Sequence, residues 1–376
     1  MSKKLGVAII GTGMSGAVQL RAAQLAGGAI EGISASTPER SAAIADKWGV
    51  PSFTTAIQAI HSPAVDVVHV CTPNSSHYEL SKAALLAGKH VICEKPLSNS
   101  VAEAEELVEL AKSTGLVNAI PFVYRFHPMV REARARIEAG EIGPLHLLHG
   151  SYLQDYMLDP MAGNWRVDEQ YSGPSRAFAD LGSHWCDLME WITSERFSEV
   201  VASLETRVPE RPLKSGATFT TSSEKPANLH KVVTEDLGIV LLRTRLGVPA
   251  SFTVSQLSAG RKNRLWFEVD GAKASLIFDQ EEPERLWLST PKSMELLVRD
   301  PNVGSAEQRR LATLPPGHAQ GYAQCFEAFV ADTYAVIRGE TRVGLPTFAD
   351  GLRAAQITDA VLQSSRNRTW AAIAAS

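Results

Sequence analysis

The stretch Leu5-Gly-Val-Ala-Ile-Ile10-Gly-Thr-Gly-Met-Ser-Gly16 decides the fold of this chain. Its first six residues form an apolar run, which is typical of a strand buried on both faces of a parallel sheet. Glycines then recur in a G-x-G-x-x-G pattern, at Gly11, Gly13 and Gly16. In this pattern the first glycine permits a tight turn, the second lets the backbone approach a phosphate, and the third lets a helix pack closely on the strand.

The sequence on either side of the glycine pattern supports a phosphate-binding loop. Because the string follows an apolar strand and opens a helical pattern, the first N–H groups and the positive end of that helix would face a phosphate. We therefore interpret the loop as the pyrophosphate site of a nicotinamide dinucleotide, with a purely structural glycine turn as the alternative. The residues expected to line the cofactor here are Gly11, Thr12, Gly13, Met14, Ser15 and Gly16.

The first 123 residues alternate apolar runs with helical patterns. After the opening strand, apolar runs occur at Ala29–Ser34, Val65–Cys71, His90–Cys93 and Val117–Val123. Helical patterns lie between them at Pro38–Trp48, Ser75–Ala87 and Val101–Ser113. This alternation predicts an α/β domain of the Rossmann type over residues 1–123, with a doubly wound parallel sheet.

The rest of the chain, residues 124–376, has a different pattern. Longer extended stretches, several of them alternating, occur at Leu145–Tyr156, Val200–Val208, Val232–Arg245, Pro249–Gln256, Leu265–Val269 and Ala274–Phe278, with Asp270-Gly271 as a hairpin turn. Helices are expected at Met129–Ala139, Asp180–Ile192, Ala319–Ile337 and Phe348–Ser364, and a long surface loop at Pro209–Asn228. We predict an α+β domain with an open, mostly antiparallel sheet, whose C-terminal helix is able to pack back on the first domain.

Composition narrows the class of protein. Of 376 residues, 44% are hydrophobic and 21% are charged, and the net charge of −4 offers no basic surface for nucleic acid. We expect no membrane association, because no apolar run approaches the roughly 18 residues that span a bilayer and the opening run is too short for a signal peptide. The four cysteines form no C-x-x-C pair, so we expect them to be buried and reduced in a cytoplasmic protein.

The end of the second predicted strand bears on the choice between NAD and NADP. An acidic residue at that strand end would bind the ribose 2′-hydroxyl, and none stands there. The side chains of Ser36, Thr37 and Arg40 instead offer donors to a 2′-phosphate, which favours NADP. The alternative is that NAD binds without an acid and that Arg40 is a solvated helix residue.

Two further groups of residues are candidates for catalysis. Lys95 follows the His90–Cys93 strand, at the edge where parallel sheets bind ligands, although a lysine there is also a common surface residue. Asp180 and His184 are four residues apart and share a helix face. A carboxylate beside an imidazole suits a general base that removes a hydroxyl proton. A zinc site and a structural histidine are the alternatives, but no third ligand is apparent and we expect no metal.

These segments resemble the Gfo/Idh/MocA family of oxidoreductases from about Val7 to Leu362. The resemblance is carried by the glycine loop, Cys71-Thr-Pro-Asn-Ser-Ser-His77, Glu94-Lys-Pro96, Tyr124-Arg-Phe-His-Pro128, Asp180-x-x-x-His184, Gly321-Tyr322 and Pro346-Thr-Phe-Ala-Asp-Gly351. It implies that Lys95, Asp180 and His184 form the catalytic group, with His184 as the proton acceptor or donor. It also implies a homodimer or homotetramer through the C-terminal sheet, and further cofactor contacts from Thr72, Pro73, Asn74, His77 and Glu94.

The expected substrate residues combine aromatic rings, which stack on sugar C–H surfaces, with polar groups that meet hydroxyls. They are Tyr124, Arg125, Tyr152, Asp155, Trp165, Arg166 and Tyr322. Packing in the core or in an interface is the alternative for the aromatic members. The sequence departs from the family before Asp180, where Ser172-Gly-Pro-Ser-Arg-Ala-Phe-Ala replaces a run of glycines. Within it, Arg176 either grips an anionic substrate or lies on the surface.

We therefore predict an NAD(P)-dependent oxidoreductase, with NADP favoured, that transfers a hydride between nicotinamide and a hydroxyl-bearing carbon of a sugar, anhydrosugar or cyclitol. One alternative is a glycosidase-type enzyme that recycles a bound nicotinamide. Another is a non-catalytic regulator that senses the dinucleotide. The presence of both Lys95 and His184 argues for an enzyme, because such regulators often lose one of them.

Overall fold

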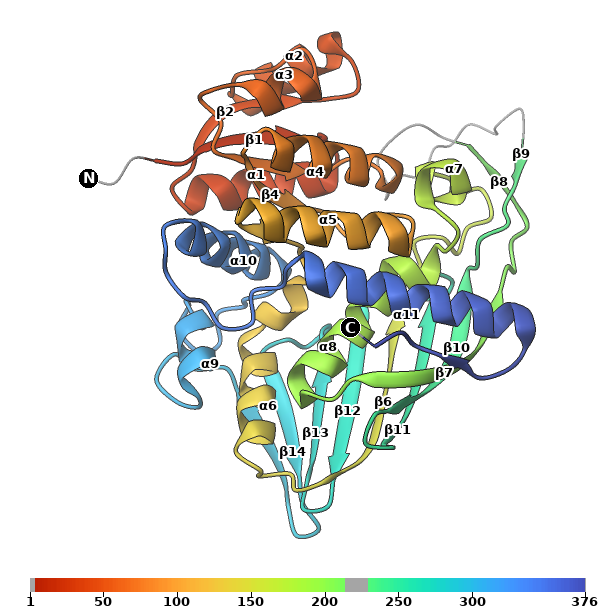
Figure 1. Ribbon diagram of the computed structural model, residues 1–376. Helices are drawn as coiled ribbons and strands as arrows, with labels where there is room; N and C mark the ends of the chain where they lie inside the picture. The colour runs from red at the N-terminus through yellow and green to blue at the C-terminus, as the bar shows by residue number, and fades with distance from the viewer. Residues whose placement is uncertain (1–3, 214–228, 376) are drawn as a thin grey trace. The chain divides into compact units, whose positions relative to one another are not determined.

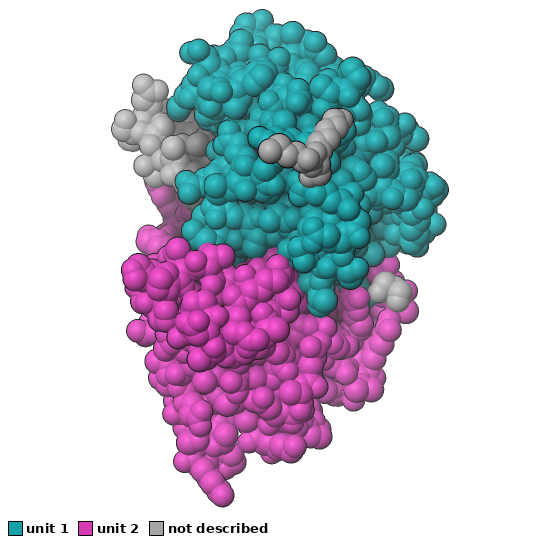
Figure 2. All heavy atoms as spheres, turned by 90° about the vertical axis from the view of Figure 1, so that its left-hand side faces the viewer, with its two compact units in different colours: residues 1–122, 170–173, 323–355 teal, residues 123–169, 174–322, 356–376 magenta. Residues whose placement is uncertain are grey.

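The computed structural model of the chain describes residues 4–213 and 229–375. The chain divides into two compact units, which Figure 2 colours separately. Unit 1 contains Met1–Phe122, Gln170–Gly173 and Ala323–Ala355. Unit 2 contains Val123–Glu169, Pro174–Tyr322 and Gln356–Ser376. Unit 1 is thus assembled from three stretches of the chain.

Within the described residues, unit 1 is built on a parallel sheet of five strands in the order β2-β1-β3-β4-β5. The strands are β1 (Gly6–Ile10), β2 (Ala29–Ser34), β3 (Val67–Val70), β4 (His90–Cys93) and β5 (Asn118–Ala119). The helices are α1 (Met14–Leu25), α2 (Pro38–Trp48), α3 (Ala56–His61), α4 (His77–Leu86), α5 (Val101–Thr114), most of α10 (Tyr322–Ile337) and the start of α11 (Phe348–Asn367) (Figure 1). The predicted Rossmann-type fold is confirmed, and α3 is an addition to it.

Local sequence signals fix the ends of these helices. The Thr37 hydroxyl caps α2 by accepting a hydrogen bond from the Arg40 N–H at 3.2 Å. Pro38 occupies the first helical position, and Gly49 ends the helix in the left-handed region with φ at 65°. The predicted bounds of α2 are therefore confirmed residue for residue.

Residues from late in the chain complete the core of unit 1. Phe348 is fully buried in the same apolar core as Val68, and its backbone N–H donates to the Asn118 side chain at 2.8 Å. The Ile120 N–H donates to the Pro346 carbonyl at 3.1 Å. The short strand β5 is therefore held by a segment that follows it by more than two hundred residues.

Within the described residues, unit 2 holds a sheet of nine strands in the order β15-β14-β13-β12-β6-β11-β10-β7-β16, and a separate β8–β9 pair. The strands are β6 (Leu145–Leu153), β7 (Phe197–Glu205), β8 (Glu210–Pro212), β9 (Leu229–Lys231), β10 (Leu237–Thr244), β11 (Pro249–Ser255), β12 (Arg264–Gly271), β13 (Ser275–Asp279), β14 (Arg285–Ser289), β15 (Met294–Val298) and β16 (Ala371–Ala372). Only β6 and β11 pair in parallel among these described strands, so the mostly antiparallel sheet is confirmed. The helices of this unit include α6 (Pro128–Glu138), α8 (Ser183–Thr193) and α9 (Ala306–Leu311).

One face of this sheet is open. Burial alternates along β10, where Val240 and Leu242 are buried while Ile239 and Leu241 are exposed. On the buried face, the Trp185 indole of α8 stacks on a phenylalanine ring of β11, with ring centroids 4.6 Å apart. The predicted open sheet is therefore confirmed.

Three features of unit 2 differ from the prediction. The strands β14 and β15 and the helix α9 were not predicted. Asp270 and Gly271 end β12, and the hairpin turn is closed by a Gly271 N–H bond to the Ala274 carbonyl, so the predicted turn position is wrong by about two residues. Of the predicted loop at Pro209–Asn228, the first part pairs as β8 with β9, and residues 214–228 lie outside the described residues.

All four cysteines are free and buried, as predicted. Among the described residues, no helix combines the length and the apolar character that crossing a bilayer requires.

Candidate active site

The glycine loop has the geometry that a dinucleotide phosphate needs. Gly11 has φ of +99°, and a Cβ there would lie 2.3 Å from the Cys71 carbonyl oxygen. A Cβ on Gly16 would lie 2.1 Å from the Gly11 carbonyl oxygen, whereas a Cβ on Gly13 would meet no atom within 4 Å. Gly11 and Gly16 are therefore required by the fold, while Gly13 leaves open space at the start of α1.

The start of α1 suits an anion. Gly13 is its N-cap and supplies no side-chain cap, and no acidic residue lies in the first turn. The N–H groups of the first turn and the positive end of the helix dipole thus face a region that carries no negative charge from the helix itself. The loop fits the pyrophosphate of a dinucleotide.

The predicted ribose residues lie at the carboxyl end of β2. Ser36, Thr37 and Arg40 are all exposed, but the Thr37 hydroxyl is engaged as the cap of α2. Glu39 lies on the same helical turn, and hydrogen bonds from its own backbone N–H and from Thr37 lower its carboxyl pKa, so it is charged at neutral pH. The ribose 2′-position of a bound dinucleotide would therefore lie near one cation, Arg40, and one anion, Glu39.

The loops that follow β3 and β4 are joined by His77. Its ring nitrogens lie 2.9 Å from the Thr72 carbonyl oxygen and 2.6 Å from the Pro96 carbonyl oxygen, and the side chain is buried. In the first of these loops, the Asn74 amide donates to the Ser172 carbonyl at 2.9 Å. His77 therefore holds both loops in place through their backbone carbonyls.

Glu94 ends a buried chain of hydrogen bonds that the sequence did not predict. The Tyr334 hydroxyl lies 2.8 Å from His69 Nε2, and His69 Nδ1 lies 2.7 Å from Gln19 Oε1. The Gln19 amide in turn donates to Glu94 Oε1 at 2.6 Å. Because Gln19 Oε1 only accepts, His69 donates from Nδ1 and accepts the Tyr334 proton at Nε2.

This chain holds the strand end next to Lys95. Burial lowers the His69 pKa to about 3, so the imidazole is neutral. Each group in the chain, from Tyr334 through His69 and Gln19, therefore donates a hydrogen bond to the next one, and Glu94 is the last acceptor. The one local signal in the sequence is a histidine inside an otherwise apolar strand, Val67-Val-His-Val70. Lys95 itself is half-buried and follows β4, and its peptide bond to Pro96 is cis.

Asp180 lies in unit 2 on a π-helical turn, Phe178–Gly182, that leads directly into α8. Such turns are uncommon and are often found at functional sites. The Asp180 carboxylate accepts hydrogen bonds from the Tyr156 hydroxyl and the Gln256 amide, both at 3.3 Å, and lies 3.7 Å from the Arg166 Nε atom. These groups hold the carboxylate oriented.

His184 stands in the first turn of α8, surrounded by aromatic rings. Its ring centroid is 4.8 Å from that of Tyr124 and 6.2 Å from that of Tyr152, and the side chain is buried. The Tyr124 and Tyr152 hydroxyls lie 2.5 Å apart, and the Tyr124 ring is 6.3 Å from the Tyr322 ring. Two predicted substrate residues, Tyr124 and Tyr152, therefore lie beside the predicted proton-transfer histidine, and a third, Tyr322, lies against Tyr124.

The other predicted substrate residues take different positions. Arg125 is buried and forms an ion pair with Asp187, with its Nε donating at 2.8 Å. The Arg166 guanidinium lies over the Trp165 ring at 4.4 Å, which places this pair beside Asp180. Asp155 accepts a hydrogen bond from the Lys262 ammonium at 2.6 Å.

Arg176 is buried, so of the two alternatives for this residue the surface position is wrong. Its side chain is 2% exposed and bonds to Asp236, to Gln256 at 2.8 Å and to Thr234 at 3.2 Å. Asp236 is fully buried and also lies 3.4 Å from Arg211. The segment before Asp180 is thus anchored by an internal ion network, which replaces the flexibility that a glycine run would give.

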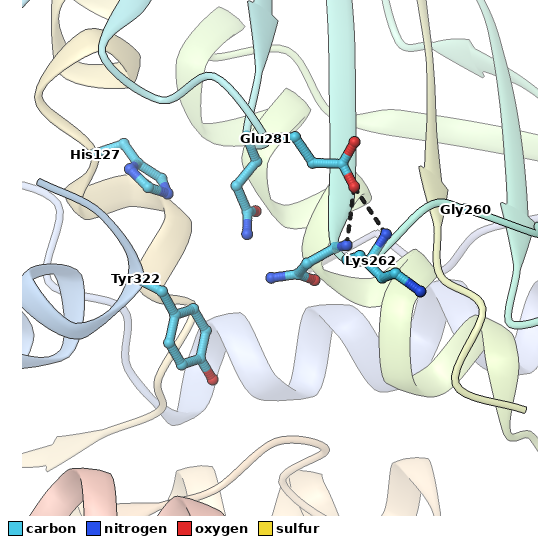
Figure 3. Close-up of a pocket in the computed structure, with 7 residues that line it drawn as sticks. His127, Gly260, Lys262, Glu281 and Tyr322 are labelled. Carbon is cyan, nitrogen blue, oxygen red and sulfur yellow. Dashed lines mark hydrogen bonds between the residues drawn. The ribbon is translucent and has the colours of Figure 1, made fainter. Parts of the chain in front are cut away.

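A pocket of about 440 Å³ lies in unit 2 beside these tyrosines. It is lined by His127, Gly260, Lys262, Asn263, Gln280, Glu281 and Tyr322, most of which Figure 3 labels. Except for Tyr322, none of these residues was predicted to act on a ligand. The polar residues lie far apart in the sequence, so no local sequence motif predicts the pocket.

One group of side chains in the described residues has the spacing of metal ligands. It consists of His149, Glu268 and Asp270 on β6 and β12, whose ligand atoms all lie within 4.8 Å of one another. The His149 Nε2 atom is 3.5 Å from a carboxylate oxygen of each acid, and burial and Asp270 raise the Glu268 pKa. An ion cluster across two strands accounts for this arrangement.

The chain matches two protein-family profiles. Residues 5–121 match an oxidoreductase family with an NAD-binding Rossmann fold, and residues 130–277 match the GFO/IDH/MocA C-terminal domain.

Characterised relatives cover much of the chain. Levoglucosan dehydrogenase of Pseudarthrobacter phenanthrenivorans is 31% identical over 345 residues, which are 90% of this chain and 88% of that protein. Inositol 2-dehydrogenase of Corynebacterium glutamicum is 31% identical over 213 residues, 56% of this chain and 59% of that protein.

Solved structures agree with these matches. An oxidoreductase domain protein from Kribbella flavida superposes with a TM-score of 0.89 at 33% identity and covers 100% of both chains. Levoglucosan dehydrogenase in complex with NADH and levoglucosan superposes with a TM-score of 0.89 at 28% identity, over 99% of this chain and 100% of that one. With the glycine loop described above, these matches show that the chain is an NAD-binding oxidoreductase of the Gfo/Idh/MocA family.

Proposed function

We propose that this enzyme transfers a hydride between nicotinamide and a hydroxyl-bearing carbon of a sugar, anhydrosugar or cyclitol. The observation that carries the proposal is that Tyr124 and Tyr152 lie beside His184 with Tyr322 against Tyr124, while the Asp180 carboxylate, four residues before the histidine, is held by hydrogen bonds. Aromatic faces and hydroxyl groups are the surfaces that polyols bind. Relatives that act on levoglucosan and on inositol support the same substrate class.

Each catalytic residue has a distinct role in this proposal. The bound nicotinamide supplies the hydride acceptor or donor. His184 takes the proton from the substrate hydroxyl, and the Lys95 ammonium donates a hydrogen bond to the same oxygen as its charge changes. Asp180 favours the protonated imidazole, and Tyr156, Gln256 and Arg166 keep the carboxylate in place. Arg125, held by Asp187, acts as a positioning residue.

Replacement of the proton-transfer group tests this assignment. In His184→Ala, kcat should fall by about 10²- to 10⁴-fold, the usual contribution of a general base, while the Kd for NADH stays unchanged. His146→Ala, an exposed histidine of the same unit, is the matched control. Turnover of the His184 variant within tenfold of the wild type would refute the role.

We further propose that the enzyme prefers NADP to NAD. Ser36 and Arg40 are exposed where a 2′-phosphate would lie, and the charged Glu39 on the same turn opposes them. One charge-assisted hydrogen bond of about 1.5 kcal/mol corresponds to a preference of about tenfold in Kd. Arg40→Ala should abolish this preference in a fluorescence titration, whereas Lys47→Ala at the far end of α2 should leave it intact. Equal Kd values for NADPH and NADH in the wild type would refute the preference.

We propose that the enzyme is a homodimer or homotetramer that assembles through the open face of the unit 2 sheet. The exposed Ile239 and Leu241 side chains on β10 support this proposal, because water-exposed aliphatic pairs on a sheet face favour association. Light scattering on Ile239→Glu should give a smaller mass than the wild type. An unchanged mass would exclude this face.

We also place the enzyme in the cytoplasm. The support is its four free cysteines, which persist as thiols in a reducing compartment. Fractionation of the native host should recover the activity with cytoplasmic markers.

A further inference from the structure

The pocket drawn in Figure 3 is formed by residues from four places in unit 2. His127 stands at the N-cap of α6, Gln280 directly follows β13, Asn263 precedes β12, and Tyr322 begins α10. Its volume of about 440 Å³ falls in the range of pockets that enclose small molecules. A ligand there would meet polar side chains from several segments of the chain.

Two of these side chains have unmet hydrogen-bonding capacity. Within the described residues, neither ring nitrogen of His127 has a hydrogen-bond partner, and Gln280 Oε1 has none. Both side chains are buried, His127 at 1% and Gln280 at 8% exposure. Buried polar atoms are almost always paired in native proteins, so a set of unpaired ones on the wall of a pocket indicates a ligand that pairs them.

The protonation state of His127 defines what that ligand must offer. Burial lowers the His127 pKa to about 4, so at neutral pH one ring nitrogen is a donor and the other an acceptor. The ring is held by stacking on Tyr124, with centroids 5.9 Å apart, and by Phe278 at 5.4 Å. Gln280 Oε1 is an acceptor only. Hydroxyl groups, which both donate and accept, satisfy all three atoms.

The charged groups of the pocket are already compensated. The Lys262 ammonium lies 2.6 Å from an Asp155 carboxylate oxygen. The Glu281 carboxylate accepts from the backbone N–H groups of Lys262 and Asn263, as Figure 3 shows, and lies 3.3 Å from the Arg261 guanidinium. Two cations and two anions thus neutralise one another, and no net charge is left to attract a phosphate or a carboxylate.

Residues of the pocket wall contact the aromatic rings that lie beside His184. Asn263 Oδ1, in the pocket wall, accepts from the Tyr152 hydroxyl and from the Gln154 amide, both at 2.7 Å. The rings of Tyr152 and Tyr124 both lie beside His184. A substrate that reaches His184 would therefore extend its other end toward His127 and Gln280.

We propose that this pocket binds the hydroxyl groups of a neutral polyol at the end remote from the reacting carbon, with His127 and Gln280 as specificity-determining contacts. The substrate class is thereby narrowed to uncharged sugars, anhydrosugars and cyclitols, and sugar phosphates and sugar acids are rejected. The proposal rests on the proposed function, because it takes His184 as the reacting end.

The test compares near-isosteric variants that remove only the polar atoms, His127→Phe and Gln280→Met, with the surface control His146→Phe. With levoglucosan or myo-inositol as substrate, KM should rise about tenfold in each pocket variant, as expected for one lost hydrogen bond, while kcat changes little. The Kd for NADH should stay unchanged. D-glucuronate and D-glucose 6-phosphate should not be turned over by the wild type.

Unchanged KM values in both pocket variants, or efficient turnover of either charged sugar, would overturn the proposal. Calorimetric titration of levoglucosan and myo-inositol into the NADH-loaded enzyme separates this proposal from the proposed function. If His184→Ala keeps turnover while His127→Phe weakens sugar binding, the proposed function fails and the pocket stands. If His184→Ala loses turnover while His127→Phe binds both sugars as the wild type does, the pocket assignment fails alone. Absence of binding of both sugars to the wild type would refute the pocket.

Discussion

Mild acid should destabilise this protein, because two histidines are buried without charge. His69 in unit 1 and His127 in unit 2 are each at most 1% exposed. Burial lowers their pKa values from 6.5 to about 3 and about 4. In the unfolded chain both return to the ordinary value and take up protons first.

The direction and size of the effect follow from this difference. Between pH 6.5 and the folded-state pKa, the unfolded state binds more protons, so stability is complete above pH 6.5 and is lost as the pH falls. At pH 5 an unfolded histidine is mostly protonated and a folded one is not, which costs about 2 kcal/mol for each residue, or about 4 kcal/mol together.

Urea denaturation followed by tryptophan fluorescence measures the loss. Of the seven tryptophans only Trp48 belongs to unit 1, so the signal reports mainly on unit 2, which contains His127. Between pH 7.5 and pH 5, the free energy of unfolding of His127→Phe should fall by about 2 kcal/mol less than that of the wild type. At pH 7.5 the variant should be at least as stable, because phenylalanine keeps the stacking and leaves no nitrogen unpaired.

Equal pH-dependent losses in the wild type and in His127→Phe would refute the reasoning. That result would mean that the folded imidazole titrates near its ordinary value and therefore has access to water or to a partner. The carboxylates contribute equally to both proteins, so the comparison isolates the single histidine.

Three further predictions concern the loop, the ion network and the lysine. Gly13→Ala should fold like the wild type but bind NADH at least tenfold more weakly, since its Cβ meets only open space, whereas Gly16→Ala should lower the melting temperature because its Cβ would lie 2.1 Å from a carbonyl oxygen. Normal NADH binding by Gly13→Ala would show that the phosphates do not approach there. Arg176→Met should lower the free energy of unfolding by about 3 kcal/mol, because it leaves Asp236 buried with one cation fewer, and a loss below 1 kcal/mol in urea would contradict this. In Lys95→Met, steady-state kcat should fall about 100-fold while the Kd for NADH is kept, and an unchanged kcat would remove the lysine from the reaction.

The sequence predicted unit 1 well because its signals are local. Parallel strands buried on both faces must be apolar along their whole length, and β2 and β4 were predicted with their observed bounds. The hairpin of β14 and β15 was missed because its apolar runs are short, as in Met294-Glu-Leu-Leu-Val298, and the second strand is largely exposed. Their strand pairing depends on a neighbour in space rather than on a period along the chain.

The candidate site was predictable only where motifs exist. The glycine loop could be found from spacing, because its backbone geometry demands glycine at Gly11 and Gly16. The contact of His69 with Tyr334 joins residues 265 positions apart, and no pattern in either segment indicates the other. His127 was quoted within a motif, but its missing partners become visible only when every atom around it is placed.

During synthesis on the ribosome, unit 1 cannot finish folding when its first 122 residues emerge. Tyr334 and Phe348, which close its core, follow about 210 and about 230 residues later, a delay of roughly 10–45 s at ordinary elongation rates. Through that interval the nascent sheet exposes an apolar surface and an imidazole that water can protonate. The glycine loop is therefore translated long before the segments that complete the core of its unit, so dinucleotide capture should begin only after Phe348 has been made.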